Sequence, residues 1–512
     1  MEQNNAIELK NVTKRFGKVI ANDNVNLSVK KGEILSILGE NGSGKTTLMN
    51  MISGIYFPDE GHIFIDGREV TIRSPKDAFS LGIGMIHQHF KLINILTAAE
   101  NIILGMPGKE KLDMQKVEKE INELTAQYGF ELDPSQKVYN MSVSQKQTVE
   151  IVKVLYRGAD ILILDEPTAV LTPQETEKLF NVLRNMRKSG KSIIIITHKL
   201  NEVLELSDRV SVLRKGKYIG TIETKSATVS SLTEMMVGEK VSLNIERDEP
   251  KNCEKRIEIT NLTCINAEGR KTLNNISFTA NSGEILGIAG IAGSGQKELL
   301  EAIAGLQNVH GGKIIYNSPE GESIQLDQMK AADIQNKGIK VSFVPEDRLG
   351  MGLVASLGMT DNMMLKNYKK TRGFFVDRKK PKELADSLIK DLGIVTPGTE
   401  TPVGRLSGGN VQKVLVGREI AAEPTVLMLA YPVRGLDINS SYTIYNLMNE
   451  QKRKGVAVIT VIEDLDVLIE LSDRILVLNG GEVTGIVDAR TTSKEEIGFL
   501  MTKNREEKAV NE

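Results

Sequence analysis

Apolar residues along this chain form short runs that alternate with stretches of helical periodicity. Ile34–Leu38 is an apolar run of strand length, which predicts a buried strand. Behind it, Leu48, Met49, Ile52 and Ile55 recur at helical spacing. The pattern therefore predicts a strand, a glycine-rich loop and a helix in that order.

The same alternation continues further along the chain. Strands are predicted at Ile161–Leu164 and Ile193–Ile196, with a helix over Gln174–Lys188 between them. Residues 97–160 carry apolar side chains at helical spacing and predict a helical insertion. Strands that alternate with helices indicate an α/β fold with a parallel-sheet core. Antiparallel strands, forming a separate β subdomain, are favoured by the segments Ile7–Leu9 and Ile63–Ile65.

The chain also repeats itself. Val25–Gly39 is echoed by Ile276–Gly290, and Glu205–Arg209 recurs without change as Glu470–Arg474, 265 residues later. A repeat of this length predicts two homologous halves of the same fold. The predicted organisation is a first α/β domain at 5–242, a polar linker at 243–256, a second domain at 257–503 and a flexible tail at 504–512.

The loop after the first strand carries a candidate phosphate-binding motif. Glycines let its backbone N–H groups point at phosphate oxygens, and the following helix adds the positive end of its dipole. Lys45 would reach the β- and γ-phosphates, and the Thr46 hydroxyl would hold Mg²⁺. The alternative is a purely structural turn. The predicted ATP-binding residues here are Gly39, Glu40, Asn41, Gly42, Ser43, Gly44, Lys45, Thr46 and Thr47.

Four polar residues beyond this loop are candidates for the catalytic chemistry. Asp165 and Glu166 end a predicted strand, where the first can hold Mg²⁺ and the second can activate water. His198 follows another strand at the expected γ-phosphate end, although a histidine there could merely cap a turn. Gln88 is placed to sense the metal and the γ-phosphate, and its alternative is a solvated loop amide.

A second glycine turn lies in the other half. Ser407, Gly408 and Gly409 precede a predicted helix, and such a turn can present N–H groups to a phosphate. Within its own half the turn has no evident ligand. It is explained if it closes over a nucleotide that is bound elsewhere.

Composition narrows the function classes. Lys and Arg total 65 against 67 Asp and Glu, a formal net charge of −2, so the basic excess of a nucleic-acid binder is missing. The two cysteines, Cys253 and Cys264, have no second pair for a metal site and fit a reducing compartment. No apolar run approaches the ~20 residues of a membrane span. We expect a soluble chain whose membrane role comes through partners.

Together these motifs resemble the twin-cassette ATP-binding subunit of an ABC importer, in the branch that serves simple sugars and nucleosides. The wording of His87–Phe90 and Pro345–Arg348 is similar to the nucleoside branch. The resemblance implies two cassettes that pair head to tail, with each ATP between one phosphate loop and the other cassette's signature turn. It also implies that Phe16 stacks on adenine, whereas its placement alone predicts a core residue.

This pairing divides the motif residues between two unequal sites. Site one combines the intact loop, Gln88, Asp165, Glu166 and His198 with the Ser407 turn. Site two has lost its chemistry in both halves, which predicts one hydrolytic site and one degenerate site. Its altered positions are Gln296, Lys297, Glu346, Ala430, Tyr431, Glu463, Ser142 and Ser144.

Lys297 is the unusual member of the degenerate site. It stands where a hydroxyl would hold Mg²⁺, while Ala430 removes the other metal ligand. One hypothesis is that its ammonium partly replaces the cation, so that the site binds nucleotide weakly without hydrolysis. The alternative is a solvated lysine that faces away from an empty site.

The resemblance implies an ATPase that uses ATP and Mg²⁺ and energises uptake of nucleosides or, alternatively, of monosaccharides. The implied partners are two integral-membrane permease subunits, an extracytoplasmic solute-binding protein reached through them, and no nucleic acid. The implied place is peripheral, on the cytoplasmic face of the membrane, with the apolar stretch Phe90–Leu104 near the permeases. Rival readings are a soluble twin-cassette translation factor, a DNA-repair ATPase and an ATP-binding module without turnover.

Overall fold

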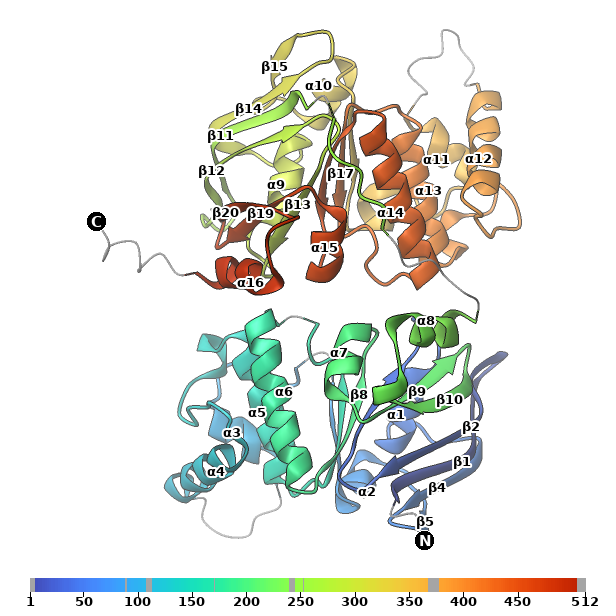
Figure 1. The fold of residues 1–512 in the computed structure, drawn as a ribbon, viewed down its shortest axis with the longest axis vertical. Coiled ribbons are helices and arrows are strands. Elements are labelled where there is room, and N and C mark those ends of the chain that lie inside the picture. The colour runs from blue at the N-terminus through green and yellow to red at the C-terminus, as the bar shows by residue number, and fades with distance from the viewer. Residues whose placement is uncertain are drawn as a thin grey trace. The chain divides into compact units, whose positions relative to one another are not determined.

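The computed structural model describes residues 5–87, 90–106, 113–169, 171–238, 245–251, 253–366 and 377–503. The chain divides into two compact units, Met1–Ser242 and Leu243–Glu512, and each contains a six-stranded and a four-stranded sheet (Figure 1). Gln88 and the predicted tail 504–512 lie outside the described residues.

The first unit is built on a six-stranded sheet. Its strand order is β10-β9-β3-β8-β7-β6, and all neighbours run parallel except the antiparallel pair β9–β10. The predicted parallel core is therefore confirmed. The strands are β3 Ile34–Leu38, β6 Ile83–Ile86, β7 Ile161–Asp165, β8 Ser192–Ile196, β9 Arg209–Arg214 and β10 Lys217–Glu223.

A four-stranded antiparallel sheet completes the β structure of this unit, in the order β2-β1-β4-β5. It confirms the antiparallel strands that the alternating segments predict. Its strands are β1 Asn5–Phe16, β2 Val19–Lys30, β4 Glu60–Ile65 and β5 Arg68–Val70. The helices of the unit are α1 Lys45–Ile52, α2 Pro75–Ser80, α3 Ala98–Ile103, α4 Met114–Tyr128, α5 Val143–Tyr156, α6 Pro173–Lys188, α7 Leu200–Leu206 and α8 Val229–Val237, with short turns η1 Val138–Asn140 and η2 Thr224–Ser226.

The second unit repeats this architecture. Its six-stranded sheet has the order β16-β17-β18-β13-β19-β20, and its antiparallel sheet the order β12-β11-β14-β15. The strands are β11 Lys255–Ile265, β12 Lys271–Asn281, β13 Ile285–Gly290, β14 Val309–Asn317, β15 Ser323–Gln325, β16 Val341–Val344, β17 Val426–Ala430, β18 Ala457–Val461, β19 Arg474–Asn479 and β20 Glu482–Asp488. The helices are α9 Gln296–Ile303, α10 Ala331–Asn336, α11 Met359–Met364, α12 Lys379–Asp391, α13 Gly408–Ile420, α14 Ile438–Arg453, α15 Leu465–Leu471 and α16 Lys494–Thr502, with short turns η3 Arg348–Gly352 and η5 Val403–Arg405.

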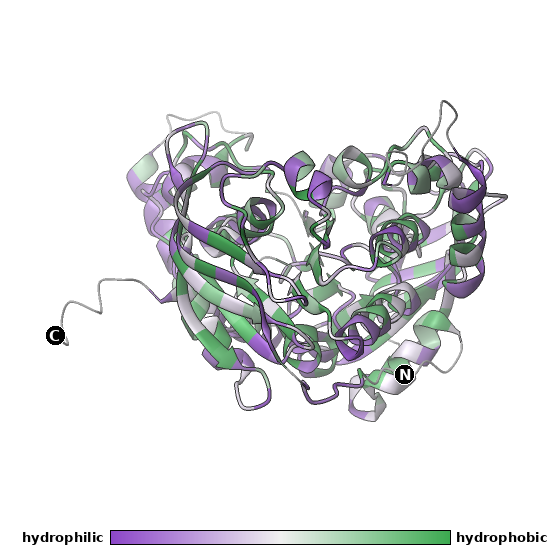
Figure 2. Ribbon diagram, turned by 90° about the horizontal axis from the view of Figure 1, so that it is seen from above, coloured by the Kyte–Doolittle hydropathy of each residue, from purple (hydrophilic) through white to green (hydrophobic). Residues whose placement is uncertain are grey.

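The inner strands of both units are buried on both faces because helices or the second sheet cover them. Every residue of β3, β8, β17 and β18 is buried. Figure 2 shows hydrophobic segments in green along the strands and hydrophilic segments in purple along several outer helices. This burial explains the continuous apolar runs, which differ from the alternation of a strand with one wet face.

The first helix is shorter than its apolar pattern predicts. α1 ends at Ile52, and Gly54 turns the chain with a φ of 76°. Ile55 is consequently 41% exposed and does not join the helix's buried face. A left-handed glycine just past a helix is the usual way to end one.

The stretch predicted to be a linker packs onto the second unit. Ile245 is buried in that unit's core, and Arg247 donates 2.8 Å hydrogen bonds to the carbonyls of Ile469 and Ser472. Lys452 reaches the carbonyl of Asp248 at 2.5 Å. The polar composition of this stretch thus reflects ion pairs and hydrogen bonds with its own unit, which a composition argument does not distinguish from solvent exposure.

Candidate nucleotide sites

The predicted phosphate loop lies between β3 and α1, as the sequence pattern requires. Gly44 has a φ of 94°, and a Cβ there would lie 2.3 Å from the carbonyl oxygen of Ala21. Only glycine fits this position. No side chain caps the start of α1. The N-terminus of the helix therefore has the form that binds a phosphate group.

Lys45 braces the loop from inside. Its side chain is buried, and Nζ donates to the carbonyls of Gly39 at 2.6 Å and Glu40 at 2.9 Å. Burial lowers the pKa of Lys45, against the opposing effect of the carboxylates of Glu166, Asp165 and Glu40. A buried cation held by backbone carbonyls alone has part of its charge available for an anionic ligand.

Two further groups of the loop region suit ATP with Mg²⁺. The Thr46 hydroxyl makes a hydrogen bond to Asp165 at the end of β7. Burial, and the neighbouring carboxylate of Glu166, raise the pKa of Asp165 to about 6. The Ser43 hydroxyl is buried without a hydrogen-bond partner among the described residues. A hydroxyl and a carboxylate side by side are the oxygen ligands that Mg²⁺ prefers.

Glu166 and His198 form a pair beside these groups. Glu166 Oε1 lies 2.9 Å from His198 Nδ1, and the backbone N–H of Glu166 donates to the Ile196 carbonyl at 2.9 Å. The hydrogen bond with His198 lowers the pKa of Glu166 despite partial burial. Its carboxylate is thus ionised at neutral pH and fixed in orientation, as a general base must be.

Phe16 is not the core residue that its place in the sequence predicts. At the end of β1 its ring is 44% exposed and makes an edge contact with Tyr56, with centroids 5.2 Å apart. Lys14 Nζ lies 5.6 Å from the ring centroid. The exposed face leaves the ring free to stack on a flat ligand.

The two predicted signature turns both cap helices, but differently. Ser142 caps α5 by accepting from the N–H of Gln145, and its hydroxyl lies 3.0 Å from that of Ser144. Ser407 caps α13 and accepts from the Asn410 side chain at 2.9 Å. The Ser407 turn keeps two bare glycines, whereas the Ser142 turn carries side chains at both matching positions.

The second unit keeps the loop but not its charge. Gln296 takes the place of Lys45, and its Nε2 donates to the Ile291 carbonyl at 3.0 Å. This is the bracing contact that Lys45 makes, without a cation. Ala430 ends β17 and is buried in the apolar core, so it offers no ligand to a metal.

Tyr431 replaces the catalytic carboxylate. Burial, with the nearby carboxylates of Glu463 and Glu346, raises the pKa of Tyr431 to about 12. A neutral phenol of this pKa cannot serve as a base near neutral pH. The geometry of the second unit thus agrees with the altered chemistry that its sequence predicts.

Arg434 occupies the middle of this altered region, and the sequence reasoning did not single it out. Its guanidinium pairs with Glu346 and, at 3.1 Å, with Glu463, and its Cζ lies 5.8 Å from the centroid of the Tyr431 ring. The position corresponds to Ala169 in the first unit, 265 residues earlier. A full alignment of the two halves would have exposed this gain of charge beside two losses.

Lys297 faces away from the role considered for it. Its Nζ lies 3.7 Å from Glu301 Oε1 on the same helix, and its side chain is 47% exposed. An ion pair of this type along a helix is ordinary surface chemistry. The observation supports the alternative of a solvated surface lysine.

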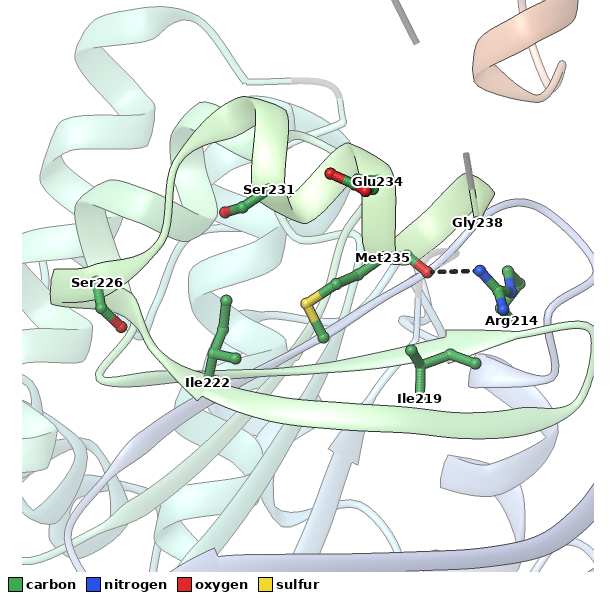
Figure 3. A pocket seen from close by; sticks show the side chains of 8 residues that line it. All are labelled: Arg214, Ile219, Ile222, Ser226, Ser231, Glu234, Met235 and Gly238. Atoms are coloured by element: carbon green, nitrogen blue, oxygen red, sulfur yellow. Dashed lines mark hydrogen bonds between the residues drawn. The ribbon is translucent and has the colours of Figure 1, made fainter. Parts of the chain in front are cut away.

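A separate hollow of about 510 Å³ lies on the first unit, away from all these residues. Met235 and Ile222 point into it, and Arg214 donates to the Met235 carbonyl at 3.5 Å beside it (Figure 3). None of the predicted nucleotide-site residues lines it. Its lining comes from β9, β10, η2 and α8 and consists of Arg214, Ile219, Ile222, Ser226, Ser231, Glu234, Met235 and Gly238.

Comparison with known proteins assigns the fold and its chemistry. Residues 22–169 and 273–433 each match the family described as ABC transporter. The nucleoside import ATP-binding protein NupA of Lactococcus lactis subsp. cremoris is 41% identical over 98% of this chain and 99% of its own. The chain belongs to the ABC transporter family. Within it, the chain is a twin-cassette importer ATPase, which binds ATP and hydrolyses it to drive import.

Other relatives agree on this assignment. The guanosine import ATP-binding protein NupO of Bacillus subtilis is 41% identical over 98% of both chains. The glucose import ATP-binding protein TsgD13 of Haloferax volcanii is 39% identical over 97% of this chain and 95% of its own. A solved complex of archaeal ribosomal stalk protein aP1 with ribosome recycling factor aABCE1 matches with a TM-score of 0.58 at 18% identity, over 93% of this chain and 90% of that one. That likeness concerns the fold alone.

None of the described helices combines the length and the apolar character that a membrane crossing requires.

Proposed function

We propose that this ATPase hydrolyses ATP at one composite site, built from the phosphate loop of the first cassette and the Ser407–Gly409 turn of the second. The observation that carries the proposal is a difference between equivalent positions. The first cassette places Asp165, Glu166 and His198 together, and the second has Ala430, Tyr431 and Glu463 in their stead. Only the first set can hold a metal and deprotonate water.

The residues of the first cassette divide the work. Lys45 and the N-terminus of α1 bind the phosphates, and Thr46 and Asp165 hold Mg²⁺, which, when bound, neutralises phosphate charge. Glu166 takes the proton of the attacking water, and His198 keeps its carboxylate in place at 2.9 Å. Phe16 stacks on adenine. Gln88, proposed as the metal and γ-phosphate sensor, lies outside the described residues.

The substitution Glu166→Gln tests the site. It preserves shape but removes the base, so turnover falls to background while ATP stays bound. Nucleotide counting and phosphate release, measured on the chain assembled with its permeases, report both effects. Turnover near the wild-type rate in Glu166→Gln would refute the assignment of this carboxylate.

We further propose that the imported solute is a nucleoside. Two relatives at 41% identity carry nucleoside or guanosine import in their names, against a glucose importer at 39%. The margin is small, so a monosaccharide is the alternative. Partners of the chain are then two integral-membrane permease subunits and, through them, an extracytoplasmic solute-binding protein, with the ATPase peripheral on the cytoplasmic face.

Uptake of labelled nucleosides and monosaccharides by a strain that lacks this chain distinguishes the two substrates. Loss of nucleoside uptake, restored by the wild-type chain and not by Glu166→Gln, is the expected result. Loss of monosaccharide uptake alone would reverse the assignment.

A further inference from the structure

The second cassette replaces catalytic chemistry with a cluster of fixed charges, which we call the Arg434 cluster: Arg434, Glu346, Glu463 and Tyr431. Each carboxylate stands at a position where the first cassette has an uncharged or basic side chain, Gln88 or His198. Arg434 is the cation between them. The cluster therefore forms without any nucleotide.

This cluster is joined to the signature turn of its own cassette. Arg348, two residues after Glu346, donates from Nη2 to the carbonyl oxygen of Arg434. Its other terminal nitrogen, Nη1, lies so near Gly408 that a Cβ there would be 3.3 Å away. One guanidinium thus touches both the cluster and the turn.

Two further contacts fix the same pieces. Gly409 packs against the start of α14, where a Cβ would lie 2.7 Å from Ser440 Oγ, and Ser440 donates to Asp437 Oδ2 at 2.8 Å. Arg418 of α13 donates to the Gly352 carbonyl at 2.7 Å and so fastens η3 to the signature helix. The turn, η3 and the segment 431–437 form one connected assembly.

We propose that Arg434 is a positioning residue for ATP hydrolysis: its ion pairs with Glu346 and Glu463 hold, through Arg348, the Ser407–Gly409 turn in the shape that receives ATP. This inference rests on the proposed composite site, because only there does the second cassette's turn meet a hydrolysed nucleotide. It gives the degenerate half a task. The cluster takes over the ordering of the turn that bound nucleotide would otherwise supply.

The test measures ATP dependence of turnover in the assembled transporter. Arg434→Gln and Arg348→Gln should each raise the half-saturating ATP concentration about fivefold, which corresponds to ~1 kcal/mol, with kcat within about twofold. The double variant should show no larger increase, because both changes break one path. Arg434→Lys, which keeps the charge, should lie nearer the wild type than Arg434→Gln.

Arg453 supplies a matched control. It also pairs with two carboxylates, Glu246 and Asp248, and is similarly exposed, but belongs to neither the cluster nor the signature turn. Arg453→Gln should leave the half-saturating ATP concentration unchanged. If Arg434→Gln lowers the melting temperature below that of Arg453→Gln, Glu463→Gln takes its place and must also raise the half-saturating concentration.

The outcomes separate this proposal from the composite site. Gly408→Glu should abolish turnover if the turn serves ATP at all; full activity there would refute the composite site itself. If Gly408→Glu is inactive while Arg434→Gln, or Glu463→Gln in its place, behaves like Arg453→Gln, the role of Arg434 is overturned alone. Effects of Arg434→Gln and Arg348→Gln that multiply would equally contradict a shared path.

Discussion

At the scale of single residues, Glu166 and Tyr431 share an uncommon backbone conformation. Their φ angles are 47° and 49°, in the left-handed region that residues with a Cβ rarely adopt. Each donates its N–H to the neighbouring parallel strand, to Ile196 at 2.9 Å and to Val461 at 3.0 Å. The backbone that presents the catalytic carboxylate is thus retained in the second cassette after the carboxylate itself is gone.

This comparison gives a pH prediction for Tyr431→Phe. The pKa of Tyr431 is raised to about 12, so its phenol stays protonated until the pH approaches that value. Turnover of the variant should therefore follow that of the wild type from about pH 6 to about pH 9. Phosphate release measured across this range tests it. Activity that the variant loses progressively as the pH rises would show that the phenolate acts as a base.

At the scale of elements, α1 and α9 differ in one decisive position. Lys45 and Gln296 make the same bracing contacts with loop carbonyls, but only lysine brings a charge. Gln296→Lys should strengthen nucleotide binding in the second cassette about tenfold, the gain typical of a charged hydrogen bond. It should not restore hydrolysis, because Ala430 and Tyr431 remain.

Nucleotide counting in a Glu166→Gln background measures this prediction directly. The expected result is more nucleotide bound per chain at low ATP, without phosphate release. Lys297→Ala is the control, since its ammonium pairs with Glu301 and should not affect binding. Hydrolysis gained through Gln296→Lys would contradict the account of a degenerate second site.

The sequence predicted elements well where the signal is local. The strand, loop and helix around Lys45 follow from apolar runs and glycines within some twenty residues, and the strands before Asp165 and His198 are equally plain. The Arg434 cluster was not predicted, because Arg434 and Glu346 lie 88 residues apart and neither belongs to a catalytic motif. Phe16 was misplaced by its sequence position because strand ends can project into solvent.

At the scale of the whole molecule, exposed apolar side chains suggest where the permeases attach. Ile93, Ile95, Leu104 and Met106 follow the Gln88 region and are all exposed, Ile95 to 73%. We expect membrane attachment to depend on permeases. Cell fractionation should find the chain at the membrane only when they are coexpressed, and Ile95→Glu should weaken that attachment. Firm membrane association without permeases would contradict this expectation.

The central claim is a single hydrolytic site that draws its signature turn from the second cassette. Gly408 and Val143 offer a matched pair, since each is the first residue of a signature helix, α13 or α5, and they stand 265 residues apart. The decisive measurement is the ATPase rate of Gly408→Glu and Val143→Glu in the assembled transporter. The account predicts that Gly408→Glu loses turnover and that Val143→Glu keeps most of it. The reverse result, loss in Val143→Glu and activity in Gly408→Glu, would contradict the composite site.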